Sequence, residues 1–315
     1  MSSSPVAPLR VAALPFAPSG ATAHAALVSG LADRLADVAR DGVSLAVFPE
    51  MSLALAWRIE RLRRTELEAL SEPLDGPSIG AVAQAVDATG VAAGVGWIER
   101  GDDGALYNSY VVCMPGGVQH VQRKVYAMES PHLQSGTRFD VFDTPWGMKM
   151  SILIGADNYM PENARVAALK GATLLVAPHC TSLGAGASSR PNWSAHSLAA
   201  RASDNGMFAV LSDAQAGPKD TRRPGAALIV DPCGVVIAEG VRPGLPVAKA
   251  SIDPDLAQRS DARRWLAARK PELYASLVAS EAQSYADARP WPQAERGTCA
   301  RGAVAVSLAV VGRKR

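Results

Sequence analysis

The sequence predicts a mixed α/β domain in which helices cover the outside of layered sheets. Strand-like and helix-like segments alternate along the chain, and no break in composition separates one group from another. The hydrophobic content of 48% with 20% charged residues is typical of a globular protein with a large buried core. We therefore expect one folded domain over residues 1–285.

The individual elements follow from local patterns. Residues 9–14 and 43–48 are short apolar runs, each closed by a proline, and predict buried strands. Between them, four apolar residues at helical spacing from 27 to 38 predict a helix that ends at the Asp-Gly pair 41–42. Turn signals at 115–117 and 231–234 predict two hairpins. The remaining strands are expected at 91–98, 110–114, 118–123, 148–154, 173–177, 208–211, 226–230, 235–238 and 247–252, and the remaining helices at 78–88, 161–169 and 193–203.

Residues 286–315 differ from the rest of the chain. They are rich in Arg, Pro and Gly, and their apolar residues have no clear period. We expect a C-terminal arm or a disordered tail there.

Composition narrows the classes of function and partner. A formal charge of +2 gives no reason to expect nucleic acid or a membrane surface as partner, and the apolar runs are too short to span a membrane. No GxGxxG or P-loop motif supports nucleotide binding, and the four cysteines have no metal-ligand spacing. With no signal-peptide pattern at the N-terminus, a reduced cytoplasmic protein is expected.

Three polar residues stand out by their placement. Glu50 follows directly on the strand 43–48, and the carboxyl edge of an α/β sheet is where ligands bind, so it is a candidate base. Lys124 closes a hairpin strand, and Glu129 lies in the loop five residues later. Taken singly, each of these residues is better explained as a solvated surface side chain.

Gly155 occupies a sharp turn from an apolar strand into a helix that begins at Pro161. Such elbows commonly present a nucleophile, because the tight turn exposes one side chain above the sheet edge. Here the elbow residue has no side chain. Relief of backbone strain is the simpler interpretation of the glycine alone.

Seven short motifs follow one another along the chain: Phe48-Pro49-Glu50, Leu106-Tyr107-Asn108-Ser109, Arg123-Lys124, Asp143-Thr144-Pro145-Trp146-Gly147, Asp157-Asn158-Tyr159-Met160-Pro161-Glu162, Gly171-Ala172 and Ile229-Val230-Asp231-Pro232. In this order and at this spacing they resemble the pattern of the nitrilase, or carbon–nitrogen hydrolase, superfamily. The resemblance covers Arg10 to Ala268, which is most of the chain.

The resemblance implies a four-layer α-β-β-α sandwich and a homodimer or higher homo-oligomer that pairs through the helices 161–169 and 193–203. It also implies a small-molecule substrate, no metal, no organic cofactor and a Glu–Lys–Cys catalytic set. By position Glu50 matches the general base, Lys124 the cation that stabilises the tetrahedral oxyanion, and Glu129 the supporting acid. The position of the family's nucleophilic cysteine falls on Gly155.

Gly155 leaves three explanations open. The chain is a mutated or engineered form of a covalent enzyme, a natural variant that uses non-covalent acid–base chemistry, or a ligand-binding descendant without activity. Glycine cannot form a thioester, so the covalent route is closed to this chain as it stands.

Other residues are expected to line the substrate site, namely Tyr126, Asp157, His179 and Cys180. Cys180 is also a candidate substitute nucleophile, because a cysteine beside a histidine ionises more readily, but a pocket-lining role fits better. Amides, nitriles and N-carbamoyl compounds all remain possible substrates.

Overall fold

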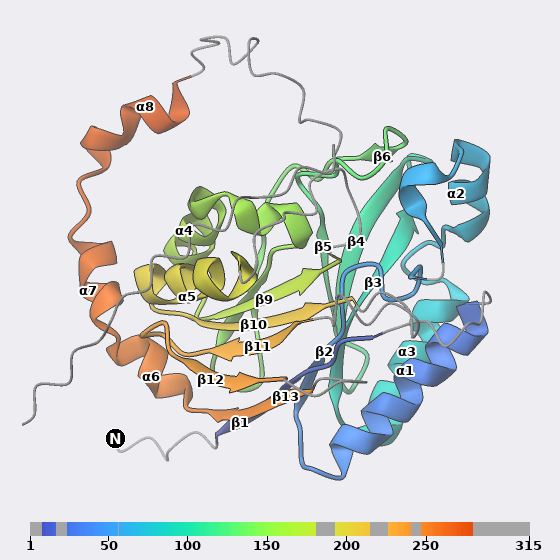
Figure 1. Cartoon of the computed structure of the whole chain (residues 1–315), viewed down its shortest axis with the longest axis horizontal. Coiled ribbons are helices and arrows are strands. Elements are labelled where there is room, and N and C mark those ends of the chain that lie inside the picture. Colours follow the sequence, from blue (N-terminus) through green and yellow to red (C-terminus); the bar gives the residue numbers. More distant parts are fainter. Residues whose placement is uncertain are drawn as a thin grey trace, which may run out of the picture.

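The computed structural model describes residues 8–16, 24–55, 57–180, 193–214, 226–240 and 247–279 of the 315-residue chain. The tail predicted at 286–315 lies outside these ranges. The described residues form two β-sheets that pack face to face, with helices on the outer face of each (Figure 1). The expected four-layer α-β-β-α arrangement is therefore confirmed.

The first sheet has the strand order β13-β1-β2-β3-β4-β5, with β6 paired to β4. Strand β2 is parallel to both β1 and β3, so these three strands end at the same edge. The strands of this sheet are β1 (Leu9–Ala13), β2 (Leu45–Val47), β3 (Ala92–Arg100), β4 (Leu106–Cys113), β5 (Gln119–Arg123), β6 (Leu133–Gln134) and β13 (Ala248–Ile252).

The second sheet has the strand order β12-β11-β10-β9-β8-β7. Its central strands β8, β9 and β10 are parallel, so their carboxyl ends also meet at one edge. The strands are β7 (Val141–Asp143), β8 (Lys149–Ile152), β9 (Leu174–His179), β10 (Phe208–Asp213), β11 (Ala227–Val230) and β12 (Val236–Glu239).

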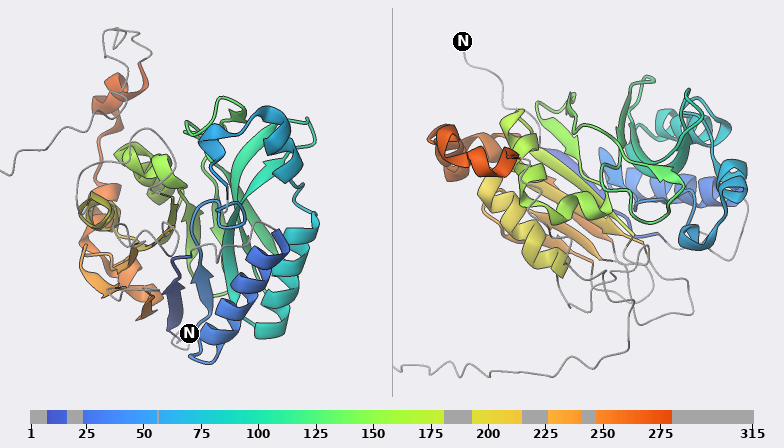
Figure 2. Two further views of the ribbon diagram at one scale, coloured as in Figure 1. Left: turned by 45° about the vertical axis from the view of Figure 1, so that its right-hand side comes forward. Right: turned by 90° about the horizontal axis from the view of Figure 1, so that it is seen from above.

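Helices cover the outer faces of both sheets (Figure 2). On the first sheet, α1 (His24–Ala39) and α3 (Pro77–Thr89) bury the predicted apolar stripe of α1. On the second sheet, α4 (Pro161–Leu169) and α5 (Trp193–Asn205) pack in the same way. The remaining helical segments are η1 (Ile59–Arg61), α2 (Arg64–Leu70), η2 (Gly155–Tyr159), α6 (Pro254–Arg259), α7 (Asp261–Ala267), η3 (Pro271–Tyr274) and α8 (Ala275–Val278).

The main core lies between the two sheets. Val47 of β2, Ile152 of β8 and Val176 of β9 belong to one buried cluster and are fully shielded from solvent. The strands that carry them lead to candidate site residues: β2 to Glu50, β8 to Gly155 and β9 to Cys180. Close packing of the inner faces therefore holds the strand ends of the two sheets in a defined relative position. Within the described ranges, every helix is too short or too polar to cross a lipid bilayer.

Candidate active site

Glu50 lies in a tight turn after β2. Its neighbour Met51 has a positive φ of 55°. The turn lies directly on β3 at Gly96, where a Cβ would collide with the main-chain nitrogen of Met51. This close approach requires glycine. Glu50, beside Met51 in the same turn, is only 2% exposed.

The Glu50 carboxylate forms an ion pair with Lys124. The Lys124 Nζ lies 2.7 Å from Oε1 of Glu50 and 2.8 Å from Oε2 of Glu129. Burial alone would lower the pKa of Lys124, but the two carboxylates together outweigh burial and raise that pKa above its ordinary value. The ammonium therefore stays protonated, and the structure brings together the three charged residues singled out from the sequence.

Asn108 on β4 joins the two carboxylates, and sequence reasoning did not assign it to the site. Its side-chain amide donates to Glu50 Oε1 at 2.7 Å and to Glu129 Oε1 at 2.5 Å. Asn108 belongs to one of the seven motifs, and that motif was the only signal that pointed to it.

Gly155 begins η2 directly after β8, with a φ of +49°. A Cβ built on Gly155 would overlap Oε2 of Glu50 and lie 2.9 Å from both Cδ and Oε1. The Glu50 carboxylate therefore fills the space beside the glycine. Asn158 holds the turn by donating to the Leu153 carbonyl oxygen at 2.6 Å.

Cys180 follows β9, which is the parallel neighbour of β8. Its main-chain N–H donates to Oε2 of Glu50 at 2.9 Å, and the residue is buried. The contact belongs to the main chain, so it does not depend on the thiol. Cys180 thus connects the end of β9 in the second sheet to Glu50 of the first sheet.

His179 closes β9 and is buried as well. Burial, the largest effect, lowers its pKa to about 4; the Lys124 ammonium acts in the same direction, and Asp213 opposes both. The imidazole is therefore neutral at pH 7. Tyr159, which was not assigned to the site from the sequence, lies beside it with a ring-centroid distance of 6.5 Å.

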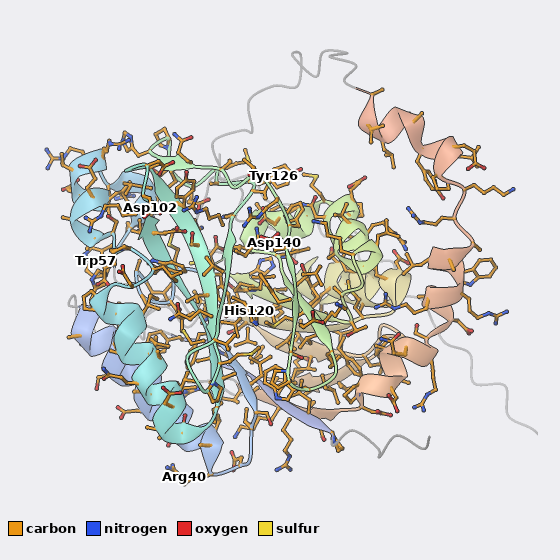
Figure 3. All side chains as sticks on the ribbon, turned by 180° about the vertical axis from the view of Figure 1, so that it is seen from behind. Arg40, Trp57, Asp102, His120, Tyr126 and Asp140 are labelled. Carbon is orange, nitrogen blue, oxygen red and sulfur yellow. The ribbon has the colours of Figure 1, made fainter. Side chains whose placement is uncertain are left out.

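Asp157 and Tyr126 were both expected to contact the substrate. The Asp157 carboxylate instead accepts hydrogen bonds from three main-chain N–H groups, including that of Tyr126 at 2.8 Å, and the residue is fully buried. This geometry does not fit a substrate contact and gives Asp157 a role in holding the loops together. The Tyr126 side chain is half-buried on the loop after β5 (Figure 3).

Within the described part of the chain, no group of three or more His, Cys, Asp or Glu side chains could hold a metal ion. The cluster of Glu50, Lys124, Glu129 and Asn108 instead offers a buried carboxylate beside a permanent cation. A carboxylate in such a place can take a proton, and the cation can stabilise negative charge that develops on a reacting oxygen or nitrogen.

Known proteins match both the sequence and the fold. The family model described as carbon-nitrogen hydrolase matches residues 10–261. An (R)-stereoselective amidase from a Pseudomonas species is 30% identical over 226 residues, which cover 70% of this chain and 76% of the amidase.

Two solved structures extend the similarity in fold. A carbon-nitrogen hydrolase from Helicobacter pylori G27 superimposes with a TM-score of 0.72 at 18% identity and covers 87% of this chain and 99% of that one. A cysteine-to-alanine variant of an amidase from Nesterenkonia sp. AN1, in complex with butyramide, gives a TM-score of 0.66 at 16% identity and covers 87% and 98%. The family model and the similarity to the Pseudomonas amidase show that the chain belongs to the carbon–nitrogen hydrolase family.

Proposed function

We propose that this chain hydrolyses a small amide, nitrile or N-carbamoyl compound without a covalent intermediate, with Glu50 acting on a water molecule in place of a cysteine thiol. The observation that carries the proposal is the position of the Glu50 carboxylate. It lies in contact with the Gly155 elbow, in the space that any side chain at position 155 would need. The base is thus presented where the family resemblance places the nucleophile.

For an amide, the proposed reaction is the addition of water followed by the loss of the amine, and Glu50 carries the proton between the two. Glu50 takes a proton from water as the water oxygen forms a bond to the carbonyl carbon. The proton then passes to the leaving nitrogen as the carbon–nitrogen bond breaks. Lys124, kept charged between two carboxylates, supplies a positive charge that favours the tetrahedral oxyanion.

The packing around Gly155 favours a natural variant over a trapped covalent enzyme. If a cysteine had simply been removed, a cavity next to the base would be expected. Glu50 instead fills this space and is held by Asn108, Lys124 and the main-chain N–H of Cys180. A thiol could enter only by displacing a carboxylate that makes these three hydrogen bonds.

The substrate class is supported by the structural relative from Nesterenkonia. In that amidase a variant that lacks a cysteine side chain is in complex with butyramide. That amidase therefore binds a small amide without the cysteine side chain, and small aliphatic amides are the first compounds to test here.

The proposal is tested by incubating the chain with amides, nitriles and N-carbamoyl compounds while intact-protein mass is recorded during turnover. We expect product without an acyl adduct. Cys180→Ser serves as a matched variant, because it keeps the main-chain N–H that binds Glu50 and loses only the thiol. Similar turnover by Cys180→Ser is expected, whereas its loss together with an adduct on Cys180 in the unmodified chain would contradict the non-covalent route.

A ligand-binding protein without activity is the alternative function. It predicts binding of a panel compound in calorimetry with no product from any of them. Binding should then survive Glu50→Gln, since a neutral amide of the same size fills the same space.

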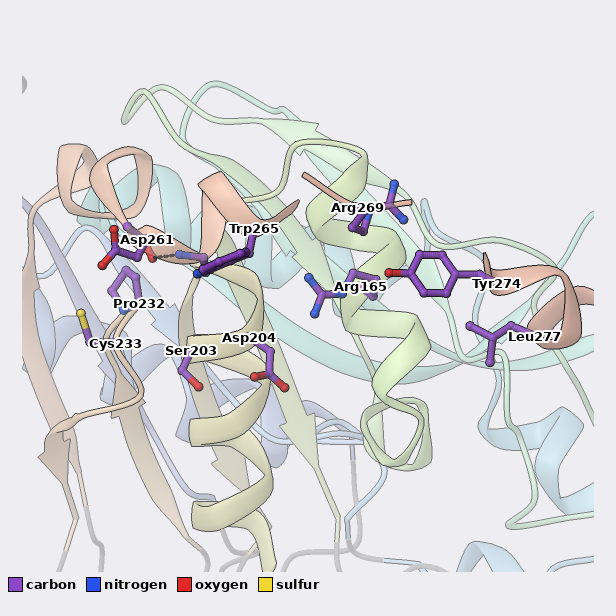
Figure 4. Close-up of a pocket in the computed structure, with 12 residues that line it drawn as sticks. Arg165, Ser203, Asp204, Pro232, Cys233, Asp261, Trp265, Arg269, Tyr274 and Leu277 are labelled. Atoms are coloured by element: carbon purple, nitrogen blue, oxygen red, sulfur yellow. Dashed lines mark hydrogen bonds between the residues drawn. The ribbon is translucent and has the colours of Figure 1, made fainter. Parts of the chain in front are cut away.

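We further propose that two copies of the chain pair through the face formed by α4 and α5 and by the segment α7–η3–α8. A groove of about 740 Å³ runs between these elements (Figure 4). The segment projects from the body of the molecule (Figure 1) and exposes large apolar side chains, with Trp265 75% and Leu277 64% exposed. Val166 and Leu169 of α4 are exposed as well. A second copy would cover this apolar surface, which a monomer leaves in water.

A further inference from the structure

The buried carboxylate of Asp157 forms hydrogen bonds to two separate parts of the site. Its Oδ1 accepts the N–H of Tyr126 at 2.8 Å, and its Oδ2 accepts the N–H groups of Val125 and Ile154, each at 3.3 Å. All three donors are main-chain groups, and the residue has no exposed surface. The side chain is thus fully engaged within the protein.

The three donors adjoin the two residues between which the reaction is proposed to occur. Val125 and Tyr126 follow Lys124, at the end of β5 in the first sheet. Ile154 precedes Gly155, at the end of β8 in the second sheet. A single carboxylate oxygen accepts from both segments, so Asp157 links the ammonium-bearing loop directly to the elbow.

Among the described residues, the main-chain hydrogen bonds of Lys124 itself stay within the first sheet. Its main-chain N–H donates to the carbonyl oxygen of Asn108 at 2.8 Å, and its own carbonyl oxygen accepts the N–H of Gly136 at 2.7 Å. These bonds fix the loop relative to β4 but not relative to the elbow. The distance from Lys124 to Gly155 therefore depends on Asp157 and on the Glu50 carboxylate.

We propose that Asp157 is a positioning residue of the reaction: its ionised carboxylate sets the Lys124 ammonium against the Gly155 elbow, and its protonation loosens that link and lowers turnover. The inference rests on the proposed function and adds a pH response to the same site. Burial of the Asp157 carboxylate raises its pKa to about 6, although the main-chain N–H donors and Lys124 act in the opposite direction. The link therefore titrates just below neutral pH.

Among the described residues, few charged groups surround the hydrogen bonds of Asp157. Lys124 is the charged side chain that acts on Asp157. Glu50 and Glu129 pair with the Lys124 ammonium, and the charge of that ammonium also acts on neutral His179 at the end of β9. Protonation of Asp157 thus removes a negative charge near Lys124 and leaves its two ion pairs in place.

The first test compares Asp157→Asn with Glu162→Gln across the pH range. The asparagine has the shape of the protonated acid, and Glu162 is an exposed carboxylate in the first turn of α4, so its change is the matched control. We expect kcat of Asp157→Asn to fall about 100-fold with KM nearly unchanged, as for a displaced catalytic group. In the unmodified chain and in Glu162→Gln, kcat should fall on the acid side of the pH profile with an apparent pKa near 6. This fall should be missing from Asp157→Asn. An Asp157→Asn enzyme with normal kcat, or with the same acid limb, would overturn the proposal.

The second test needs neither substrate nor variant. Hydrogen exchange of the unmodified chain, corrected for the intrinsic pH dependence, follows peptides that cover residues 122–127 and 153–158. We expect the protection of both segments to fall together as the pH drops below about 6, because both lose the same acceptor. Protection that is independent of pH would overturn the link. If the protection depends on pH but no compound is hydrolysed, the proposed function fails and the positioning role of Asp157 fails with it. If a compound is hydrolysed but the protection does not depend on pH, this inference alone is rejected.

Discussion

The carboxylate of Glu50 lies where a side chain on Gly155 would have to be. Two sheets contribute to this contact, since Glu50 follows β2 of the first and Gly155 follows β8 of the second. The glycine lets the Glu50 carboxylate approach the main chain of the elbow, and the elbow adopts a backbone conformation that glycine tolerates without strain. The pairing of these residues explains why an elbow without a nucleophile is combined with an intact Glu–Lys pair.

Substitution at Gly155 should therefore destabilise the protein in two ways. We expect Gly155→Ala to lose about 1–2 kcal/mol from the positive φ, and a further loss from displacing the Glu50 carboxylate. Gly104→Ala is the matched control, because Gly104 has a φ of +71° and open space around its Cβ position. Chemical denaturation should show a clearly larger loss of stability for Gly155→Ala than for Gly104→Ala.

Gly155→Cys should gain neither hydrolytic activity nor an acyl adduct. A gain of hydrolysis together with an adduct would instead favour a trapped covalent enzyme.

Removal of the Lys124 ammonium should be severe, because it leaves two buried carboxylates without their cation. We expect Lys124→Met to lower the free energy of unfolding by about 3–5 kcal/mol. Adding Glu129→Gln should recover part of that loss, which a double-mutant cycle measures. Lys249→Met, which breaks an exposed ion pair with Asp41, should have a much smaller effect. Equal losses at Lys124 and Lys249 would show that the buried cluster is not an ion pair in solution.

The buried His179 should make the fold sensitive to mild acid. Its pKa is lowered to about 4 in the folded chain, mainly by burial, against an ordinary value of 6.5. The unfolded chain therefore binds this proton more readily, and stability that is fully present above pH 6.5 is lost as the pH falls toward 4. The loss is at most on the order of 3 kcal/mol. Denaturation at pH 8 and pH 5 should show a smaller drop for His179→Gln than for the unmodified chain, and equal drops would contradict a neutral buried imidazole.

Pairing of two copies should depend on the apolar side chains of the projecting segment. We expect Leu277→Asp to convert a dimer into a monomer, because a charge cannot be buried there without a partner. Val118→Asp is the control, since Val118 is about half exposed in the hairpin turn between β4 and β5. Light scattering coupled to size-exclusion chromatography measures the mass of each. A monomeric unmodified chain at micromolar concentration would contradict the proposed pairing.

The fold was largely predictable because its core elements have strong patterns. The apolar stripe of α1 and the buried run of β2 appear at the expected places. The short helices α6, α7 and α8 were not predicted, since segments of four to seven residues show too little periodicity. The strand predicted at 148–154 ends at Ile152 as β8 because the chain then turns, and the Ile154 N–H donates to Asp157.

The site was predictable in outline and not in its contacts. Motif order pointed to Glu50, Lys124 and Glu129, which the structure brings together. It could not show that Asn108 donates to both carboxylates, because an asparagine on a strand has no distinguishing sequence pattern. It also suggested a substrate contact for Asp157, because a sequence does not reveal whether a carboxylate faces a ligand or main-chain donors.

The role of Glu50 as the base is tested most directly by kcat/KM of Glu50→Gln for whichever panel compound the unmodified chain hydrolyses. Glutamine keeps the size of the side chain and cannot take a proton, and Glu162→Gln controls for loss of an exposed carboxylate. We expect kcat/KM of Glu50→Gln to fall at least about 100-fold, as for a general base, with Glu162→Gln unchanged. A Glu50→Gln enzyme that retains the kcat/KM of the unmodified chain would contradict the non-covalent mechanism.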